Sequence, residues 1–281
     1  MKKSLLGRVS DLTVTRLVDF GAYLDGGEEF GDILLPARYI GAPLSKGDTV
    51  KVFVYRDSED RPIATTQLPR AAVGEFAMLR VVDVNRAGAF LDWGLPKDLL
   101  VPYREQATAM HPGEEHIIYI YVDNNSGRIV ASSRLGKFLD NVIPRYRHGD
   151  RVSALVYRPT PIGWQVIVDN LHSGMIYYDN LDRDLEPGQT VEARVRHVRP
   201  DGKIDLTMND DAADRVAALC QAILDRLDAN GGKLPLGDKS SPEAIAEAFG
   251  CSKRDFKHAL GALYKQGKIQ APGPDSIKAK S

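Results

Sequence analysis

Residues 9–18 alternate between apolar and polar side chains, with Leu12 and Val14 on one face and Asp11 and Thr13 on the other. This alternation predicts a half-buried β-strand. Further short strands, separated by glycine-containing turns, are predicted over residues 31–36, 49–56 and 62–68. With five short strands, the first part of the chain fits a small closed barrel, because closure removes the unpaired edges of an open sheet.

The same pattern recurs along the chain. The segment Asp32–Pro36 returns as Asp98–Pro102, and Gly47 returns as Gly113, each 66 residues later. A third copy follows, in which Gly113 corresponds to Gly188, 75 residues further on. Landmarks that keep their register across three copies indicate an internal repeat. We therefore predict three barrels, over residues 1–70, 71–140 and 141–210.

The periodicity becomes helical after Asn209. Apolar residues recur at helical spacing at Val216, Leu219, Cys220, Ile223 and Leu227. A second helix is predicted to begin after Ser241 and to stop at Gly250, since serine caps helix starts and glycine ends helices. A third helix is predicted to begin at Ser252 and to end at Gln266.

Two short segments, 268–271 and 276–279, flank a Pro-Gly-Pro turn and predict a β-hairpin. Three helices and a hairpin of this size predict a winged helix-turn-helix over residues 211–281. The fold class is therefore mainly β with a C-terminal α+β module. Exposed junctions between the modules are predicted near residues 70–74, 137–147 and 209–212.

Composition is that of an ordinary globular chain, with 43% hydrophobic residues, 27% charged residues and a formal net charge of −1. No apolar run approaches the roughly 20 residues that cross a bilayer, so we expect no membrane partner. The basic N-terminus lacks the apolar segment of a signal peptide. The two cysteines, Cys220 and Cys251, exclude a disulfide framework and a four-thiolate zinc site. We expect a soluble cytoplasmic protein.

Motifs for catalysis are missing from the sequence. The six histidines have no His-x-x-x-His spacing, and neither a phosphate-cradling Gly-x-x-x-x-Gly-Lys loop nor a Gly-x-Ser-x-Gly nucleophile motif occurs. We therefore expect no enzyme activity, no catalytic residue, no metal and no cofactor.

The C-terminal segment is the basic part of the chain, with seven Lys and Arg against two Asp over residues 251–281. On the third predicted helix, Phe256, Leu260 and Leu263 point one way. The opposite face carries the candidate phosphate-binding residues Arg254, Lys257, His258 and Lys265. Recognition of duplex DNA in the major groove is the alternative for this helix.

The repeated unit resembles the S1 RNA-binding domain, an OB-fold barrel. The likeness rests on the blocks Phe20–Tyr23 and Asp32–Pro36 and on the turn around Gly47. Three such units followed by a winged helix resemble the conserved virulence factor B family of bacterial RNA-binding proteins, and residues 256–265 resemble its C-terminal helix. This resemblance implies three S1-like OB-fold β-barrels, the third degenerate, and a role in post-transcriptional regulation.

The S1 resemblance also implies where RNA binds. The family stacks bases on two aromatics, which are Phe20 and Tyr23 here, and one of the two rings could instead fill the end of the barrel. In the second copy Ala87 replaces the first aromatic and Phe90 keeps the second. Further rings and basic support are expected from Trp93, Tyr103, Arg61 and Arg128.

The third copy departs from the motif, with Ile162, Trp164 and Gln165 across the aromatic block. We expect it to be a spacer or a packing module. We predict a non-catalytic RNA-binding protein that favours single-stranded RNA. Two alternatives stay open: a DNA-binding transcriptional regulator acting through the winged helix, and a protein–protein adaptor whose S1-like domains have lost RNA binding.

Overall fold

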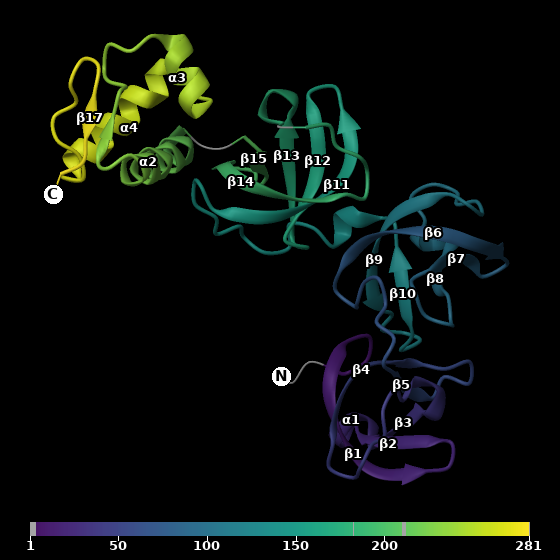
Figure 1. Cartoon of the computed structure of the whole chain (residues 1–281). Coiled ribbons are helices and arrows are strands. Elements are labelled where there is room, and N and C mark those ends of the chain that lie inside the picture. The colour runs from purple at the N-terminus through teal and green to yellow at the C-terminus, as the bar shows by residue number, and fades with distance from the viewer. Residues whose placement is uncertain (1–3, 182, 210–211, 281) are drawn as a thin grey trace. The chain divides into compact units, whose positions relative to one another are not determined.

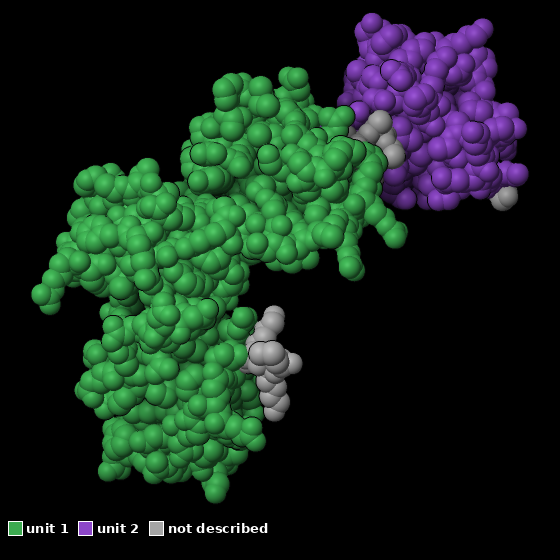
Figure 2. Space-filling model, turned by 180° about the vertical axis from the view of Figure 1, so that it is seen from behind, with its two compact units in different colours: residues 1–208 green, residues 209–281 purple. Residues whose placement is uncertain are grey.

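The computed structural model describes residues 4–181, 183–209 and 212–280. The chain divides into two compact units, residues 1–208 and residues 209–281 (Figure 2). The first unit contains three five-stranded barrels, and the second contains three helices and a short sheet (Figure 1). The fold class is the predicted one, mainly β with a small C-terminal helical module.

Barrel 1 is closed, with the strand order β1-β2-β3-β5-β4. Its elements are β1 Val9–Val18, β2 Gly21–Asp25, α1 Gly27–Phe30, β3 Asp32–Pro36, η1 Ala37–Tyr39, β4 Thr49–Arg56 and β5 Pro62–Thr65. The predicted alternation in β1 holds, because Leu12 and Val14 are buried while Asp11 and Thr13 are exposed. Closure is completed by the parallel pair β3–β5, through Leu34 opposite Ile63 in register.

One glycine recurs at the start of the second strand of every barrel. A Cβ atom on Gly21 would lie 2.2 Å from the carbonyl oxygen of Leu35, and the corresponding distances for Gly88 and Gly163 are 2.2 and 2.3 Å. Only a residue without a side chain lets the neighbouring strand come this close. This close approach explains the glycine in the repeated aromatic block.

Barrel 3 is closed in the same way, with the order β11-β12-β13-β15-β14. Its elements are β11 Arg151–Thr160, β12 Gly163–Val168, β13 His172–Tyr177, η4 Tyr178–Asn180, β14 Thr190–Val198 and β15 Ile204–Thr207. Barrel 3 packs on barrel 2 through a shared apolar cluster that includes Phe76, Leu155 and Ile167. The backbone N–H of Phe76 also donates to the side chain of Asn170 at 2.8 Å.

Barrel 2 departs from the prediction of full closure. Its elements are β6 Phe76–Asn85, β7 Gly88–Asp92, β8 Leu99–Pro102, η2 Tyr103–Glu105, β9 Glu115–Val122, β10 Ile129–Ser132 and η3 Leu135–Lys137. The sheet order is β10-β9-β6-β7-β8, so β8 and β10 are its two edges where the other barrels have a parallel pair. Lys97, just before β8, and Arg128, just before β10, both bind the loop that joins β4 to β5 of barrel 1.

The second unit is a winged helix. Its elements are α2 Ala212–Ala229, β16 Lys233–Leu234, α3 Pro242–Phe249, α4 Lys253–Lys265 and β17 Ile277–Lys278. Ser241 and Ser252 cap α3 and α4 by accepting backbone N–H groups at 3.1 Å, as predicted. The predicted hairpin forms through the bridge between Ile269 and Ala279, and β16 adds a strand beside β17 that periodicity did not indicate.

The predicted exposed junctions need one correction. Residues 70–74 are held in place, because Ala71 is buried and the backbone N–H of Val73 donates to the carbonyl of Gly7. The junction at 137–147 is open at Val142 and Ile143, which are 57% and 81% exposed. Of the third junction, 209–212, residues 210 and 211 lie outside the described residues, as does the boundary at 210/211.

Candidate nucleic-acid interface

An aromatic pair lies on the outside of barrel 1. Phe20 is 59% exposed, and its ring lies edge-on to that of Tyr23, with 6.4 Å between the centroids. The guanidinium of Arg16 covers the Tyr23 ring at 4.0 Å from its centroid, and Nε of Arg16 lies 3.4 Å from the carboxylate of Asp32. Neither ring fills the barrel end. The pair offers a surface on which a base can stack, with a cation beside it for a phosphate.

Strand register explains why Arg16 meets Tyr23. A bulge in β1 between Val14 and Arg16 shifts the pairing so that Arg16 stands opposite Tyr23 on β2. Sequence reasoning missed Arg16. Its signal was present, since Arg16 falls within the alternating strand that precedes the aromatic block, but the bulge that sets the pairing is visible only in the structure.

The same bulge occurs in the other barrels and presents different chemistry. In barrel 2 it places Asp83 opposite Phe90. Burial raises the pKa of Asp98 above its ordinary value, and the nearby charges of Asp92 and Asp83 raise it further. This side of Phe90 is therefore acidic, and phosphates are repelled from it.

In barrel 3 Gln165 stands opposite Arg158, and the guanidinium of Arg158 lies 5.2 Å from the centroid of the ring of Tyr157 on its own strand. The Nε–H of Arg158 donates to the side chain of Gln165 at 2.8 Å, and the two residues are cross-strand partners. Trp164 packs against the barrel core, and the hydroxyl of Tyr178 donates to the carbonyl of Thr160 at 2.8 Å. These contacts all lie within barrel 3.

Trp93 is not a binding-surface residue, which corrects its predicted role. It is 3% exposed and packs edge-on against Phe53 of β4, with 5.6 Å between the ring centroids. Its indole N–H donates to the carbonyl of Lys97 at 2.6 Å. Phe53 and Tyr55 of barrel 1 belong to the same apolar cluster as the core of barrel 2. Trp93 therefore joins the two barrels, and only 3% of its surface is left exposed beside the cavity that it helps to line.

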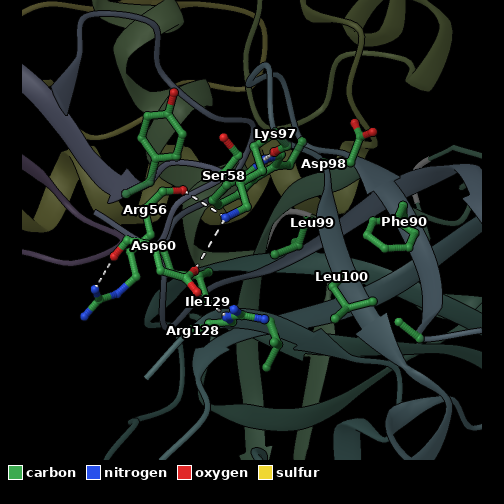
Figure 3. Close-up of a pocket in the computed structure, with 14 residues that line it drawn as sticks. Arg56, Ser58, Asp60, Phe90, Lys97, Asp98, Leu99, Leu100, Arg128 and Ile129 are labelled. Atoms are coloured by element: carbon green, nitrogen blue, oxygen red, sulfur yellow. Dashed lines mark hydrogen bonds and ion pairs between the residues drawn. The ribbon is translucent and has the colours of Figure 1, made fainter. Parts of the chain in front are cut away.

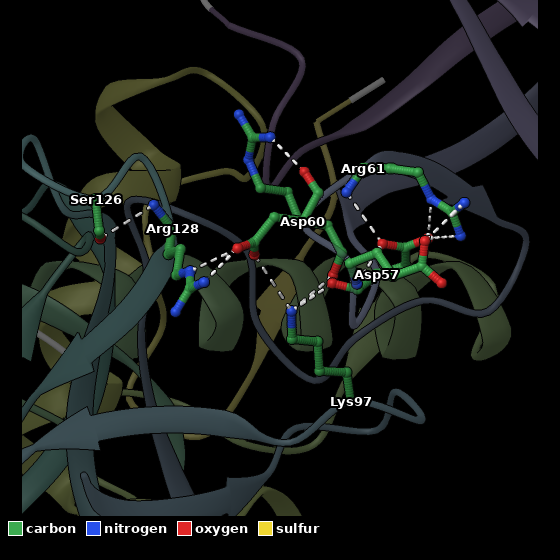
Figure 4. Close-up of polar contacts among 8 residues, drawn as sticks. Asp57, Asp60, Arg61, Lys97, Ser126 and Arg128 are labelled. Atoms are coloured by element: carbon green, nitrogen blue, oxygen red, sulfur yellow. Dashed lines mark hydrogen bonds and ion pairs between the residues drawn. The ribbon is translucent and has the colours of Figure 1, made fainter.

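The two predicted arginines meet at the loop between β4 and β5. Arg61 pairs with Asp57 at 2.8 Å and with Glu59 at 2.9 Å. Arg128, from barrel 2, pairs with Asp60 of the same loop (Figure 4). The structure thus brings Arg128 to barrel 1, whereas Arg61 pairs with carboxylates of its own loop.

Phe90 and Tyr103 lie at separate hollows of barrel 2. Phe90 lines a cavity of about 500 Å³ together with Arg128 (Figure 3). Tyr103 is 53% exposed and lines a different hollow near Thr108. Its hydroxyl donates to the carbonyl of Asn85 at 2.8 Å, which holds the turn between β6 and β7.

The exposed face of α4 carries the predicted basic side chains. Phe256, Leu260 and Leu263 are buried in the winged-helix core. The predicted binding residues are all exposed, namely Arg254, Lys257, His258 and Lys265. Lys257 also pairs with Asp238 at 3.1 Å. Tyr264, 53% exposed on the same side as Lys257, was missed, although its spacing of seven residues from Lys257 places it there.

The part of the chain that the structure describes comprises residues 4–181, 183–209 and 212–280. Within it, no group of three or more His, Cys, Asp or Glu side chains could hold a metal ion. The helices in these ranges are all too short or too polar to span a membrane.

Comparison with known proteins agrees with this description. The model of the S1 domain matches residues 6–67 and 73–134, and the model of the CvfB-like winged helix domain matches residues 221–278. Both are binding domains, and the S1 domain is a nucleic-acid-binding one. The chain is 30% identical over 274 residues to the uncharacterized protein YitL of Bacillus subtilis, covering 94% of this chain and 90% of that one.

Two further relatives cover most of the chain. Conserved virulence factor B of Staphylococcus aureus is 29% identical over 232 residues, or 79% of this chain and 77% of that one. A crystal structure of a multidomain protein with nucleic acid binding domains from Streptococcus pneumoniae is 26% identical, covers 99% of each chain and superposes with a TM-score of 0.41.

Proposed function

Because the chain belongs to the conserved virulence factor B family, with tandem S1 domains and a winged helix, we propose that it is a non-catalytic RNA-binding protein that favours single strands. Its regulatory role, post-transcriptional control of gene expression, is proposed from the family alone. Nucleic acid is the partner class that its domains share.

The observation that carries the proposal is the exposed aromatic pair Phe20 and Tyr23 with the guanidinium of Arg16 beside it. Bases in a duplex are stacked on one another, whereas the bases of a single strand can leave the stack and lie on exposed rings. An aromatic surface therefore favours single strands over duplexes.

Duplex DNA bound through α4 is the second candidate function. The favouring observation is the exposed basic face that carries Arg254, Lys257 and Lys265. That face has no Asn or Gln to read adenine edges, and it presents the ring of Tyr264. Phosphate contacts without base readout bind all sequences alike, so α4 supports RNA binding as readily as DNA binding.

The test is the binding of a labelled single-stranded RNA to Phe20→Ala and Tyr23→Ala variants, followed by fluorescence anisotropy. Stacking is worth about 1–3 kcal/mol per base, so each variant should lose about 5- to 150-fold in affinity. Tyr178→Ala is the matched control, because Tyr178 is an exposed ring outside the aromatic pair. Unchanged affinity in a folded Phe20→Ala, Tyr23→Ala double variant would reject the stacking surface.

A further inference from the structure

A cavity of about 500 Å³ lies where barrel 1 meets barrel 2 (Figure 3). Phe90, Leu100 and Ile129 of barrel 2 line it, and Ser58 and Asp60 of barrel 1 line it as well. Residues of both edge strands, β8 and β10, line the cavity. Apolar walls with a few charged groups at the rim are typical of a site for a small, flat ligand.

The loop from barrel 1 is fixed in place by its own hydrogen bonds. The Asp57 carboxylate accepts the backbone N–H groups of Glu59 and Arg61 at 2.9 and 3.0 Å. A guanidinium N–H of Arg56 donates to the carbonyl of Asp60 at 2.6 Å, and Asp60 has a left-handed φ of 61°. The loop therefore presents the Asp60 carboxylate to barrel 2 in one orientation.

Two cationic side chains of barrel 2, Lys97 and Arg128, bind this loop. Arg128 pairs with the Asp60 carboxylate, and Nζ of Lys97 donates to the carbonyls of Arg56 and Asp57 at 3.2 and 2.7 Å (Figure 4). The hydrogen bond from Arg128 holds the pKa of Asp60 below its ordinary value, so this carboxylate is charged at neutral pH. A carboxylate and a phosphate present the same kind of oxygens to a guanidinium, which binds either through two parallel hydrogen bonds.

We propose that this cavity is a composite site for one nucleotide of single-stranded RNA, in which the Asp60 carboxylate occupies the place of the phosphate on Arg128 until RNA displaces it. The base lies on Phe90 and Leu100. Asp98 also lines the cavity and Asp83 is the cross-strand neighbour of Phe90, so these acidic groups direct the phosphate away from themselves and toward Arg128. The inference rests on the proposed function. It adds that barrel 2 also binds RNA and that the Asp60 carboxylate competes with the RNA phosphate for Arg128.

The proposal makes Asp60 a residue that weakens RNA binding. In the parent chain the phosphate replaces a carboxylate on Arg128, whereas in Asp60→Asn the guanidinium is free to neutralise a phosphate and release its counterion. Asp60→Asn should therefore bind single-stranded RNA several-fold more tightly at low salt. Its plot of log affinity against log salt should be steeper by about 0.7, the value for one added phosphate contact on a single strand.

The matched control is Glu59→Gln. It removes the same charge from the same loop, but Glu59 pairs with Arg61 instead of Arg128. It should leave the affinity and the salt slope close to those of the parent. The double variant Asp60→Asn, Arg128→Ala should lose the added slope. An Asp60→Asn variant that behaves like Glu59→Gln, or that binds RNA more weakly, would overturn the proposal.

A second variant covers the case in which Asp60→Asn loosens the contact between the barrels. Phe90→Ala keeps the Asp60–Arg128 pair and removes the stacking ring, so affinity for RNA should fall about fivefold or more. If the parent binds RNA and Phe20→Ala weakens it while Phe90→Ala and Asp60→Asn change nothing, only the composite site fails. If the parent binds no RNA at any salt concentration, the proposed function itself fails.

Discussion

Replacing Trp93 by alanine distinguishes a role in stabilising the contact between barrels 1 and 2 from a role in binding RNA. Trp93 is 3% exposed, so the substitution removes an almost fully buried indole ring that packs against Phe53. Truncations of this kind cost about 3–5 kcal/mol. The hydrogen bond to the carbonyl of Lys97 at 2.6 Å is lost as well, and it contributes about 1 kcal/mol. We expect a loss of at least 3 kcal/mol from the unfolding free energy of barrels 1 and 2.

Urea denaturation followed by far-UV circular dichroism measures this loss without using tryptophan fluorescence, which the substitution itself changes. Tyr264→Ala is the matched control, since it removes an exposed ring and should change stability by no more than about 0.5 kcal/mol. At a temperature where the variant is folded, Trp93→Phe should bind RNA like the parent. The reasoning is refuted if Trp93→Ala keeps its stability and weakens RNA binding as Phe20→Ala does.

Three further predictions follow from the structure. Removing the positive charges of α4 in the triple variant Arg254→Ala, Lys257→Ala, Lys265→Ala should flatten the plot of log RNA affinity against log salt by about 1.4, which is about 0.7 for each of Arg254 and Lys265, because Lys257 already pairs with Asp238. Anisotropy titrations measure the slope, and an unchanged slope would mean that this face is only solvated. Limited proteolysis should cut first beside Ile143, which is 81% exposed, and not at 70–74; early cleavage inside 70–74 would contradict the packing of that junction. Hydrogen bonds from the backbone of His111 and from the side chain of His116 lower the pKa of Glu114 to about 2. The stabilising effect of the ionised Glu114 should therefore persist from neutral pH down to about pH 4 and disappear as the pH falls toward 2. Thermal melts of Glu114→Gln should show a weaker dependence on pH in that range than melts of the parent.

Local patterns predicted the elements of this fold well. The alternation in residues 9–18 gave the bounds of β1, and the serine and glycine signals gave the ends of α3 and α4 to within a residue. The repeat gave three barrels because each copy forms its own sheet from nearby segments. These features depend on interactions within about one module, which a sequence pattern can carry.

The contacts between barrels could not be predicted in this way. Trp93 reads as a free aromatic because its partner Phe53 lies 40 residues earlier in another module. Arg128 reads as a free cation for the same reason, since Asp60 is 68 residues away. Barrel 2 lacks the parallel hydrogen-bonded pair that would join β8 to β10, beside the loop of barrel 1, and no periodicity within barrel 2 reveals this difference.

Competition between nucleic acids tests the central claim most directly. A labelled single-stranded RNA is bound to the full chain and displaced by unlabelled single-stranded RNA or by duplex DNA of equal length, at one fixed salt concentration. The aromatic surface of barrel 1 predicts that duplex DNA is needed at roughly tenfold or higher concentration, equivalent to about 1.4 kcal/mol of preference. Displacement by duplex DNA at equal or lower concentration would contradict single-stranded RNA as the ligand.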